Sequence, residues 1–195
     1  RIGECLHLQV RDIDVTTNPI QIKIRAATTK SRQERIAYIS SEAWAALKPL
    51  LLNKEPEDLI FIAKYTKASL ISFEMQFGRL RKKLNLTDKY DDGRNYHVNI
   101  HAFRAYFHTQ ATKVLGGDIG HALLGHRKYL DMYLRLSVEE KSEMYHKLEP
   151  YITVSDEMRQ KGMLQEKDRQ IIELQSMKDE LNKQKAKIKR LEESR

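Results

Sequence analysis

The sequence predicts a mainly α-helical domain with a small antiparallel β-sheet over residues 1–154, followed by a charged helical tail at 155–195. Two short runs alternate apolar and polar residues with period two, which is typical of half-buried strands. Longer segments repeat apolar residues every three to four positions, the spacing of one helix face. All nine tyrosines, all five phenylalanines and the one tryptophan lie before Ser155. We therefore expect the globular core in residues 1–154 only.

The two predicted strands lie at 20–25 and 35–40 and form an antiparallel pair. The polar stretch 28–33 connects them and forms the tip of the hairpin. This tip carries two basic residues, Lys30 and Arg32.

Two amphipathic helices are expected next, at 41–52 and 68–84. Their apolar residues repeat at helical spacing, so we expect these side chains to be buried. The predicted buried residues are Trp44, Leu47, Leu50 and Leu51 in the first helix, and Leu70, Phe73, Phe77, Leu80 and Leu84 in the second.

Capping signals bound two further helices. Asn99 is a favourable N-cap for a helix that Gly116-Gly117 ends. Ser137 and Glu140 have the spacing of a capping box ahead of another helix. We expect that helix to end near Leu148, because Pro150 follows.

The tail carries a partial heptad pattern. Leu174, Leu181 and Ile188 recur every seven residues, and the seam is interrupted by Lys178, Gln184 and Lys185. Ile171, Met177 and Leu191 lie near it. Both a short coiled coil and a lone charged helix fit this pattern.

The formal charge of +8 and the pI of about 9.4 favour an anionic partner. One cysteine, Cys5, cannot form an intrachain disulfide and suits a reducing, cytoplasmic compartment. No apolar run approaches the length of about 20 residues that spans a membrane, so we expect no membrane partner. Because the chain starts at Arg1 without a methionine, we expect an amino-terminal part of the natural protein to precede it.

The residues with most chemical meaning lie between Asn99 and Tyr133. His101 and Arg104 are three positions apart in a helical stretch and share a face. Leu124-Gly125-His126 follows about one helix later, and then two tyrosines. Imidazole, guanidinium and phenol groups together suit the binding of a phosphodiester and its attack by a hydroxyl.

This order resembles the HxxR…LGH…Y signature of the tyrosine recombinases, or phage-type integrases. Arg1-Ile2-Gly3-Glu4-Cys5-Leu6 is similar to the first arginine box of that family, and 8–14 to the segment that follows the box. Lys30 stands between the two strands, where the family has a catalytic lysine. The resemblance runs from Arg1 to about Tyr151. It implies a DNA breaking and rejoining domain at 1–154 with a mainly helical fold and a small antiparallel sheet.

The resemblance also implies roles for individual residues. Arg1 and Arg104 would clamp the scissile phosphate, and His101 would act as base. His126 would donate to the phosphate or position the nucleophile, and Lys30 would protonate the leaving 5′ oxygen. The basic residues on or near the hairpin are predicted to contact the DNA backbone; they are Arg25, Arg32 and Arg35.

The nucleophile departs from the usual spacing of the family, which places the tyrosine about nine residues after the LGH histidine. Tyr129 is three residues after His126 and Tyr133 is seven after it. Tyr133 follows Met132, a hydrophobe-then-tyrosine arrangement like that of the family, so we choose Tyr133. Tyr145 and Tyr151 are reserves.

Each of these residues also has an ordinary structural explanation when it is taken alone, and only the ordered set favours catalysis. Asp12 and Asp14 lack a third ligand, and Asp91-Asp92-Gly93 lacks the rest of a calcium loop. With no phosphate-binding loop or dinucleotide fingerprint, no metal or cofactor is predicted.

The predicted function is site-specific DNA recombination or integration without metal, through a 3′-phosphotyrosyl intermediate. The predicted partners are double-stranded DNA and further copies of the chain, assembled as a tetramer on DNA. Two alternatives remain at this stage: a DNA-binding relative that does not cut, and an enzyme like the type IB topoisomerases.

Overall fold

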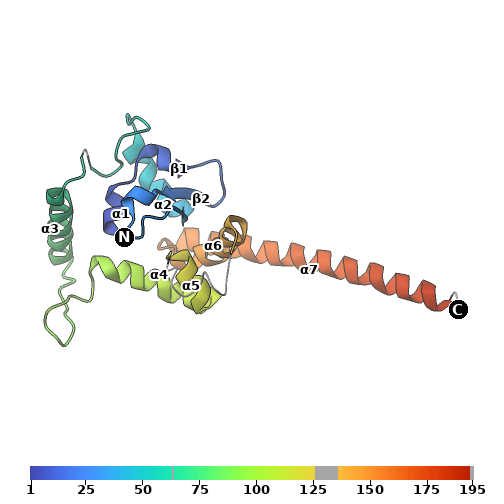
Figure 1. Ribbon diagram of the computed structural model, residues 1–195. Helices are drawn as coiled ribbons and strands as arrows, with labels where there is room; N and C mark the ends of the chain where they lie inside the picture. The colour runs from blue at the N-terminus through green and yellow to red at the C-terminus, as the bar shows by residue number, and fades with distance from the viewer. Residues whose placement is uncertain (63, 126–135, 194–195) are drawn as a thin grey trace. The chain divides into compact units, whose positions relative to one another are not determined.

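The computed structural model describes residues 1–62, 64–125 and 136–193. Contacts divide the chain into two compact units, Arg1–Ile152 and Thr153–Arg195. The first holds the sheet and six of the labelled α-helices, and the second holds one long helix (Figure 1). The mainly helical fold with a small antiparallel sheet is therefore confirmed.

The sheet has three antiparallel strands in the order β1-β2-β3. β2 (Ile20–Ile24) pairs along its whole length with β3 (Arg35–Ile39), which confirms the predicted hairpin. The two-residue strand β1 (Ile13–Asp14) adds to the other edge of β2 and was not predicted from the sequence. Its shortness explains this, because two residues show no period.

The core lies on one side of this sheet. Ile22 and Ile24 point from β2 into a cluster with Leu8, Leu47 and Ile60. The short helix α1 (Ile2–Leu6) and the helix α2 (Ser41–Leu47) border it. The backbone N–H of Ile60 donates to the carbonyl of Leu8 over 2.9 Å, which ties the segment after α2 to the end of α1.

The predicted helix at 41–52 is shorter than its apolar pattern suggested. Ser40 caps α2 by accepting from the Ala43 N–H at 3.1 Å, but a 3₁₀ turn, Lys48–Leu51, follows. Its three-residue turns rotate the later side chains away from the face that Leu47 uses. The burial predicted for Leu50 is therefore wrong, since this residue is 48% exposed.

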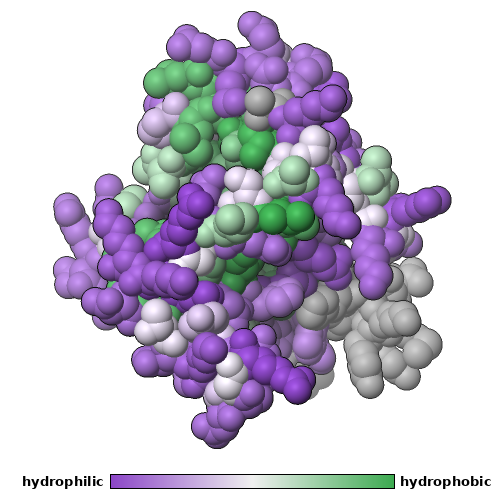
Figure 2. Space-filling view, turned by 90° about the vertical axis from the view of Figure 1, so that its left-hand side faces the viewer, coloured by the Kyte–Doolittle hydropathy of each residue, from purple (hydrophilic) through white to green (hydrophobic). Residues whose placement is uncertain are grey.

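Helix α3 (Lys67–Lys83) forms where predicted but packs less closely than its pattern implied. Phe77 meets Phe103 edge-on with ring centroids 5.8 Å apart, and Leu70 and Phe73 are half-buried. Leu80 and Leu84 are exposed, so the prediction that they face inward is wrong. The side of the molecule that carries α3 is mainly hydrophilic and is interrupted by hydrophobic patches (Figure 2).

Helices α4 (Ile100–Leu115) and α5 (Gly117–Leu123) form a tight pair. The Asn99 side chain caps α4 by accepting from the Ala102 N–H at 2.9 Å, as predicted. Gly116 ends it with a φ of +89°, a conformation that favours glycine. Ala111 is fully buried against α5, where a Cβ added to Gly120 would lie 3.2 Å from Thr112 Oγ1.

Helix α6 (Val138–Ile152) begins with the predicted capping box. The Ser137 N–H donates to Glu140 Oε2 at 2.7 Å, and the Glu140 N–H donates to Ser137 Oγ at 3.0 Å. The predicted end near Leu148 is wrong, because the helix continues through Pro150 to Ile152. Pro150 lies in the last turn, where one missing N–H does not stop the helix.

The second unit is built on α7 (Asp156–Glu193), a single helix of 38 residues. No helix in the described part of the chain is long and apolar enough to cross a membrane.

Leu148 and Leu50 form a matched pair for testing which leucine side chains of the first unit are buried. Leu148 is completely buried, so Leu148→Ala should lower the free energy of unfolding by about 3 kcal/mol through lost burial and a cavity. Leu50→Ala, on the exposed 3₁₀ turn, should change it by less than about 0.5 kcal/mol. Urea unfolding of the two variants measures both values. Equal losses would contradict the placement of the two side chains.

Candidate active site

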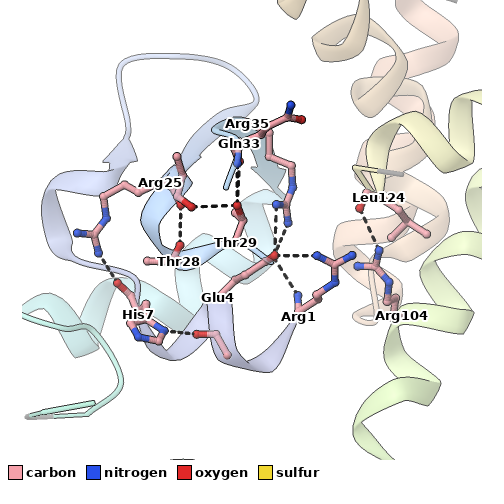
Figure 3. Close-up of polar contacts among 12 residues, drawn as sticks. Arg1, Glu4, His7, Arg25, Thr28, Thr29, Gln33, Arg35, Arg104 and Leu124 are labelled. Carbon is pink, nitrogen blue, oxygen red and sulfur yellow. Dashed lines mark hydrogen bonds and ion pairs between the residues drawn. The ribbon is translucent and has the colours of Figure 1, made fainter. Parts of the chain in front are cut away.

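A buried carboxylate lies between two arginines at one end of the sheet. Glu4, on α1, is only 5% exposed. Arg35, at the start of β3, donates to both of its carboxylate oxygens, and Arg1 Nη1 lies 3.2 Å from Oε1 (Figure 3). The Glu4 carboxylate thus holds two guanidinium groups side by side.

The two arginines control the charge of this carboxylate. Burial by itself acts to raise the pKa of Glu4, since a carboxylate loses water solvation inside the protein. The hydrogen bonds and positive charge of Arg35, with the charge of Arg1, outweigh burial and leave the pKa of Glu4 below its ordinary value. Glu4 is therefore ionised throughout the neutral range.

Arg104 approaches the same place from α4. Its Nη2 donates to the carbonyl oxygen of Leu124 at 3.0 Å. Burial lowers the pKa of Arg104, and the positive charges of Arg1 and Arg35 lower it further, while Glu4 acts in the opposite sense. Arginine stays protonated in proteins despite such shifts. Arg104 therefore lies near enough to Arg1 and Arg35, which line the same cavity, to be repelled by their positive charges.

These groups line one cavity of about 340 Å³. Three positive charges, from Arg1, Arg35 and Arg104, face a single negative charge from Glu4. The rest of the lining is mainly apolar and includes Phe103. A site with this excess of positive charge and with planar donors suits an anion such as a phosphodiester.

The turn after α5 closes against Arg35. Gly125 has a φ of +71°, and a Cβ added there would lie 2.7 Å from both Cδ and Nε of Arg35. Glycine suits both the conformation and the approach, because a Cβ at this position would force Arg35 to shift. Arg104 holds the preceding residue, Leu124, by its carbonyl, so two cavity arginines fix the Leu124-Gly125 turn.

The next residue in the chain is His126, which lies outside the described residues. The two candidate nucleophiles, Tyr129 and Tyr133, also lie outside them. Their roles stay predictions.

Of the remaining predicted residues, His101 lies exposed in the first turn of α4, three positions before Arg104. Lys30 and Arg32 are exposed on the connection between β2 and β3. Thr29 anchors this connection, because its buried Oγ1 donates to the Ala26 carbonyl at 3.0 Å and accepts from the Gln33 N–H at 3.0 Å (Figure 3). The structure therefore fixes the base of the tip that carries Lys30.

The three predicted DNA contacts occupy different environments. Arg32 is exposed at the hairpin tip with a φ of +50°. Arg25 is bound within the domain, since its Nε lies 3.1 Å from the buried Asp12 carboxylate and its Nη2 donates to the His7 carbonyl at 2.6 Å. Arg35 lines the cavity. Their contacts with DNA stay predictions.

The role of Glu4 and the place of Arg35 in the cavity were not predicted from the sequence. A signal was present for Glu4, because an acid three residues after Arg1 shares its helical face. Tyr145, a reserve nucleophile, also lines the cavity. Burial raises its pKa well above the ordinary value, so its hydroxyl is harder to ionise than that of an exposed tyrosine. Tyr151, the other reserve, is 45% exposed at the end of α6.

Among the described residues, no group of three or more histidine, cysteine, aspartate or glutamate side chains could hold a metal ion.

The profile of the phage integrase family matches residues 1–129. The chain belongs to this family. Its match includes α1, the sheet, α4, α5 and the Leu124-Gly125 turn, and so every cavity-lining residue except Tyr145 of α6.

A relative within the curated proteins is the tyrosine recombinase XerA of Saccharolobus solfataricus, which is 28% identical over 153 residues. That match covers 75% of this chain and 45% of the relative, so the chain spans less than half the length of the recombinase it resembles. No solved structure matches.

Because the pKa of Glu4 is lowered in the folded protein, its contribution to the free energy of unfolding should depend on pH. A carboxylate with a depressed pKa stabilises the fold fully above its ordinary, unfolded pKa, and that contribution is lost as the pH falls through the lower folded pKa. Glu4→Gln should therefore lower the free energy of unfolding by about 2 kcal/mol at pH 7, and the difference from wild type should shrink below about pH 4.

Denaturant unfolding between pH 3 and pH 7 measures this difference. Glu57→Gln is the matched control, because Glu57 pairs with Arg11 at 3.3 Å on the surface with its side chain 66% exposed. It should change stability by less than about 1 kcal/mol. A pH-independent loss in Glu4→Gln would contradict the ionised buried carboxylate.

Gly125 allows a second comparison, because Gly93 shares its conformation but not its neighbour. Gly93 has a φ of +64° with no atom within 4 Å of an added Cβ. Gly93→Ala should thus cost about 1 kcal/mol of backbone strain alone. Gly125→Ala should cost more, because the new methyl group collides with Arg35. Unfolding free energies measure both, and equal losses would argue against the contact with Arg35.

Proposed function

We propose that this domain performs site-specific DNA recombination by cutting and rejoining DNA strands through a 3′-phosphotyrosyl intermediate. The observation that carries the proposal is the cavity that Arg1, Arg35 and Arg104 line together with the single carboxylate of Glu4. Membership of the phage integrase family supports recombination as the general activity. Double-stranded DNA is the proposed partner.

The arginines of the cavity would bind the scissile phosphate. A guanidinium group presents two N–H donors in a plane, which matches two phosphate oxygens and stays charged as the phosphorane forms. Arg1, the N-cap residue of α1, and Arg104, on α4, enter the cavity from different segments, so they can contact different oxygens. Donors held in place before the reaction usually supply the largest share of catalysis.

Glu4 and Arg35 would act on this clamp indirectly. The Glu4 carboxylate offsets part of the repulsion among the three guanidinium groups and orients Arg1. Arg35 fills the space between Glu4 and Gly125, so it connects the clamp to the turn that precedes His126. Both are proposed as positioning residues.

The chemical step needs a nucleophile, a base and an acid. In the proposed step the Tyr133 oxygen attacks phosphorus, His101 takes the phenolic proton, and the bond from phosphorus to the 5′ oxygen breaks. Lys30 gives the leaving oxygen a proton, and His126 donates to the phosphate. Attack by a 5′ hydroxyl of another strand reverses these transfers and releases the tyrosine. The exposed hairpin tip leaves Lys30 accessible to a bound duplex.

The assembly that exchanges strands is proposed to be a tetramer of copies on two DNA sites, acting in the cytoplasm. Arg32, exposed beside Lys30, would contact the DNA backbone. Each phosphate contact of this kind steepens the salt dependence of binding by about 0.9 in logarithmic slope.

A nicked DNA substrate that traps the covalent intermediate tests the reaction. Wild-type protein should form a protease-sensitive adduct with the DNA, in excess EDTA as well, because guanidinium groups supply the positive charge. Tyr133→Phe should bind the DNA and form no adduct, since it lacks only the attacking hydroxyl. Tyr129→Phe is the matched control and should retain the adduct. Gel mobility before and after proteolysis measures each outcome.

The other outcomes are equally informative. A wild-type protein that binds the substrate without forming any adduct would refute cleavage and favour a DNA-binding relative that does not cut. An adduct lost in Tyr129→Phe and kept in Tyr133→Phe would refute the assignment of the nucleophile and leave the chemistry intact. Relaxation of a supercoiled plasmid without exchange between two duplexes would favour an activity like that of type IB topoisomerases.

A further inference from the structure

Helix α7 exposes apolar side chains along its described length. It extends as one continuous helix (Figure 1), and its 38 residues make it about 57 Å long. A solitary helix gains little stability from burial. The exposed apolar residues of α7 are Met158, Met163, Leu164, Ile171, Ile172, Leu174, Met177, Leu181 and Ile188.

Four of these residues form a seam with alternating spacing of three and four. Ile171, Leu174, Leu181 and Ile188 lie on it, and each is at least 50% exposed. Lys178 and Lys185 occupy the two remaining positions of the same seam. The seam covers residues 171–188, about 27 Å of helix, and its spacing is that of a two-stranded coiled coil.

We propose that α7 pairs through residues 171–188 with α7 of a second copy of this chain, and that the two helices run antiparallel. Two features support a second copy in the antiparallel direction as the partner: the positions of the two lysines in the seam and the distribution of charge along the helix.

The lysines decide against a parallel pair. In a parallel pair in register, Lys178 and Lys185 would each face the same lysine of the partner, which puts two like-charge layers inside the seam. In an antiparallel pair with Ile171 opposite the partner's Ile188, Lys178 lies opposite the partner's Leu181. Lys185 then lies opposite the partner's Leu174. Each lysine stem covers a leucine while its ammonium group reaches water.

The charges along the seam favour the same direction. Residues 171–179 carry a net charge of −1, and residues 180–188 a net charge of +2. An antiparallel pair places the first segment against the second segment of the partner, so unlike charges meet twice. A parallel pair would place like charges together in both segments.

The pair has a two-fold axis between Asp179 and Glu180, since each residue pairs with the one at the mirrored position of the partner. A contact of this kind uses the same surface on both copies and closes as a dimer. It therefore links two copies without generating a filament. The link does not depend on the cavity of the first unit, so it stands or fails independently of the proposed DNA reaction.

Disulfide trapping on the full chain distinguishes the two directions. The background is Cys5→Ser, because Cys5 is the one natural thiol. Ile171→Cys and Ile188→Cys are made separately in it, one with a size tag, and then mixed under reducing conditions and oxidised. The antiparallel pair places these two positions in one layer, whereas two copies of position 171 lie about 25 Å apart. A disulfide needs Cα atoms within about 7 Å.

The expected result is a disulfide-linked heterodimer in the mixture and no linked dimer from either variant alone. Ile172→Cys is the matched control, since Ile172 is exposed next to the seam but outside it, and it should not link with Ile188→Cys. Linked dimers from each single variant, with no heterodimer, would establish a parallel pair and overturn the proposal. A mixture that gives no linked dimer would also overturn it.

Discussion

The ion pair between Glu4 and Arg35 is the contact on which the site depends. It joins α1 to β3 across a gap of 31 residues in the chain and places Arg35 where Gly125 meets it. Arg1 shares the same carboxylate. Three segments distant in sequence therefore converge on one buried acid, and removing that acid would leave two guanidinium groups without their counter-charge.

Burying this pair is costly, so its presence needs a physical explanation. Desolvation is the largest single influence on Glu4, and it opposes the charged form. Buried ion pairs often contribute little net stability compared with well-packed apolar residues. The arrangement is better explained by what it holds in place, because it keeps Arg1 and Arg35 close to Arg104 despite their mutual repulsion. In the proposed function, positive charge gathered in this way would meet the scissile phosphate without rearrangement.

The two units of the chain use apolar surface differently. In the first, residues from α1, the sheet and α2 enclose Ile22, Ile24 and Leu47. In the second, α7 has the same types of residue on one stripe, and they remain exposed. A single helix cannot enclose its own apolar face, so the exposed apolar residues of α7 fit the proposal that this helix forms one half of an interface. In the proposed pair, the lysines in the stripe would lower the affinity and at the same time restrict the direction of pairing.

Local signals determined much of this protein from the sequence alone. The hairpin strands, the Asn99 cap, the Gly116 stop and the Ser137 capping box each depend on residues a few positions apart, so they could be predicted without a fold. The motifs from Arg1 to His126 indicated the family because each is short and they follow one another in a fixed order along the chain. The exposure of Leu50 and Leu80 could not be predicted, because periodicity shows which face is apolar but not whether another element covers it.

The composition of the cavity was decided only by the tertiary structure. Arg25, Arg32 and Arg35 look alike as basic residues of one hairpin, yet one binds Asp12, one is exposed at the tip and one lines the cavity with Arg1 and Arg104. What separates them is the position of partners elsewhere in the chain. Charge and hydrogen bonding act through space over a few ångströms, so the role of each arginine follows from the side chains that folding places beside it.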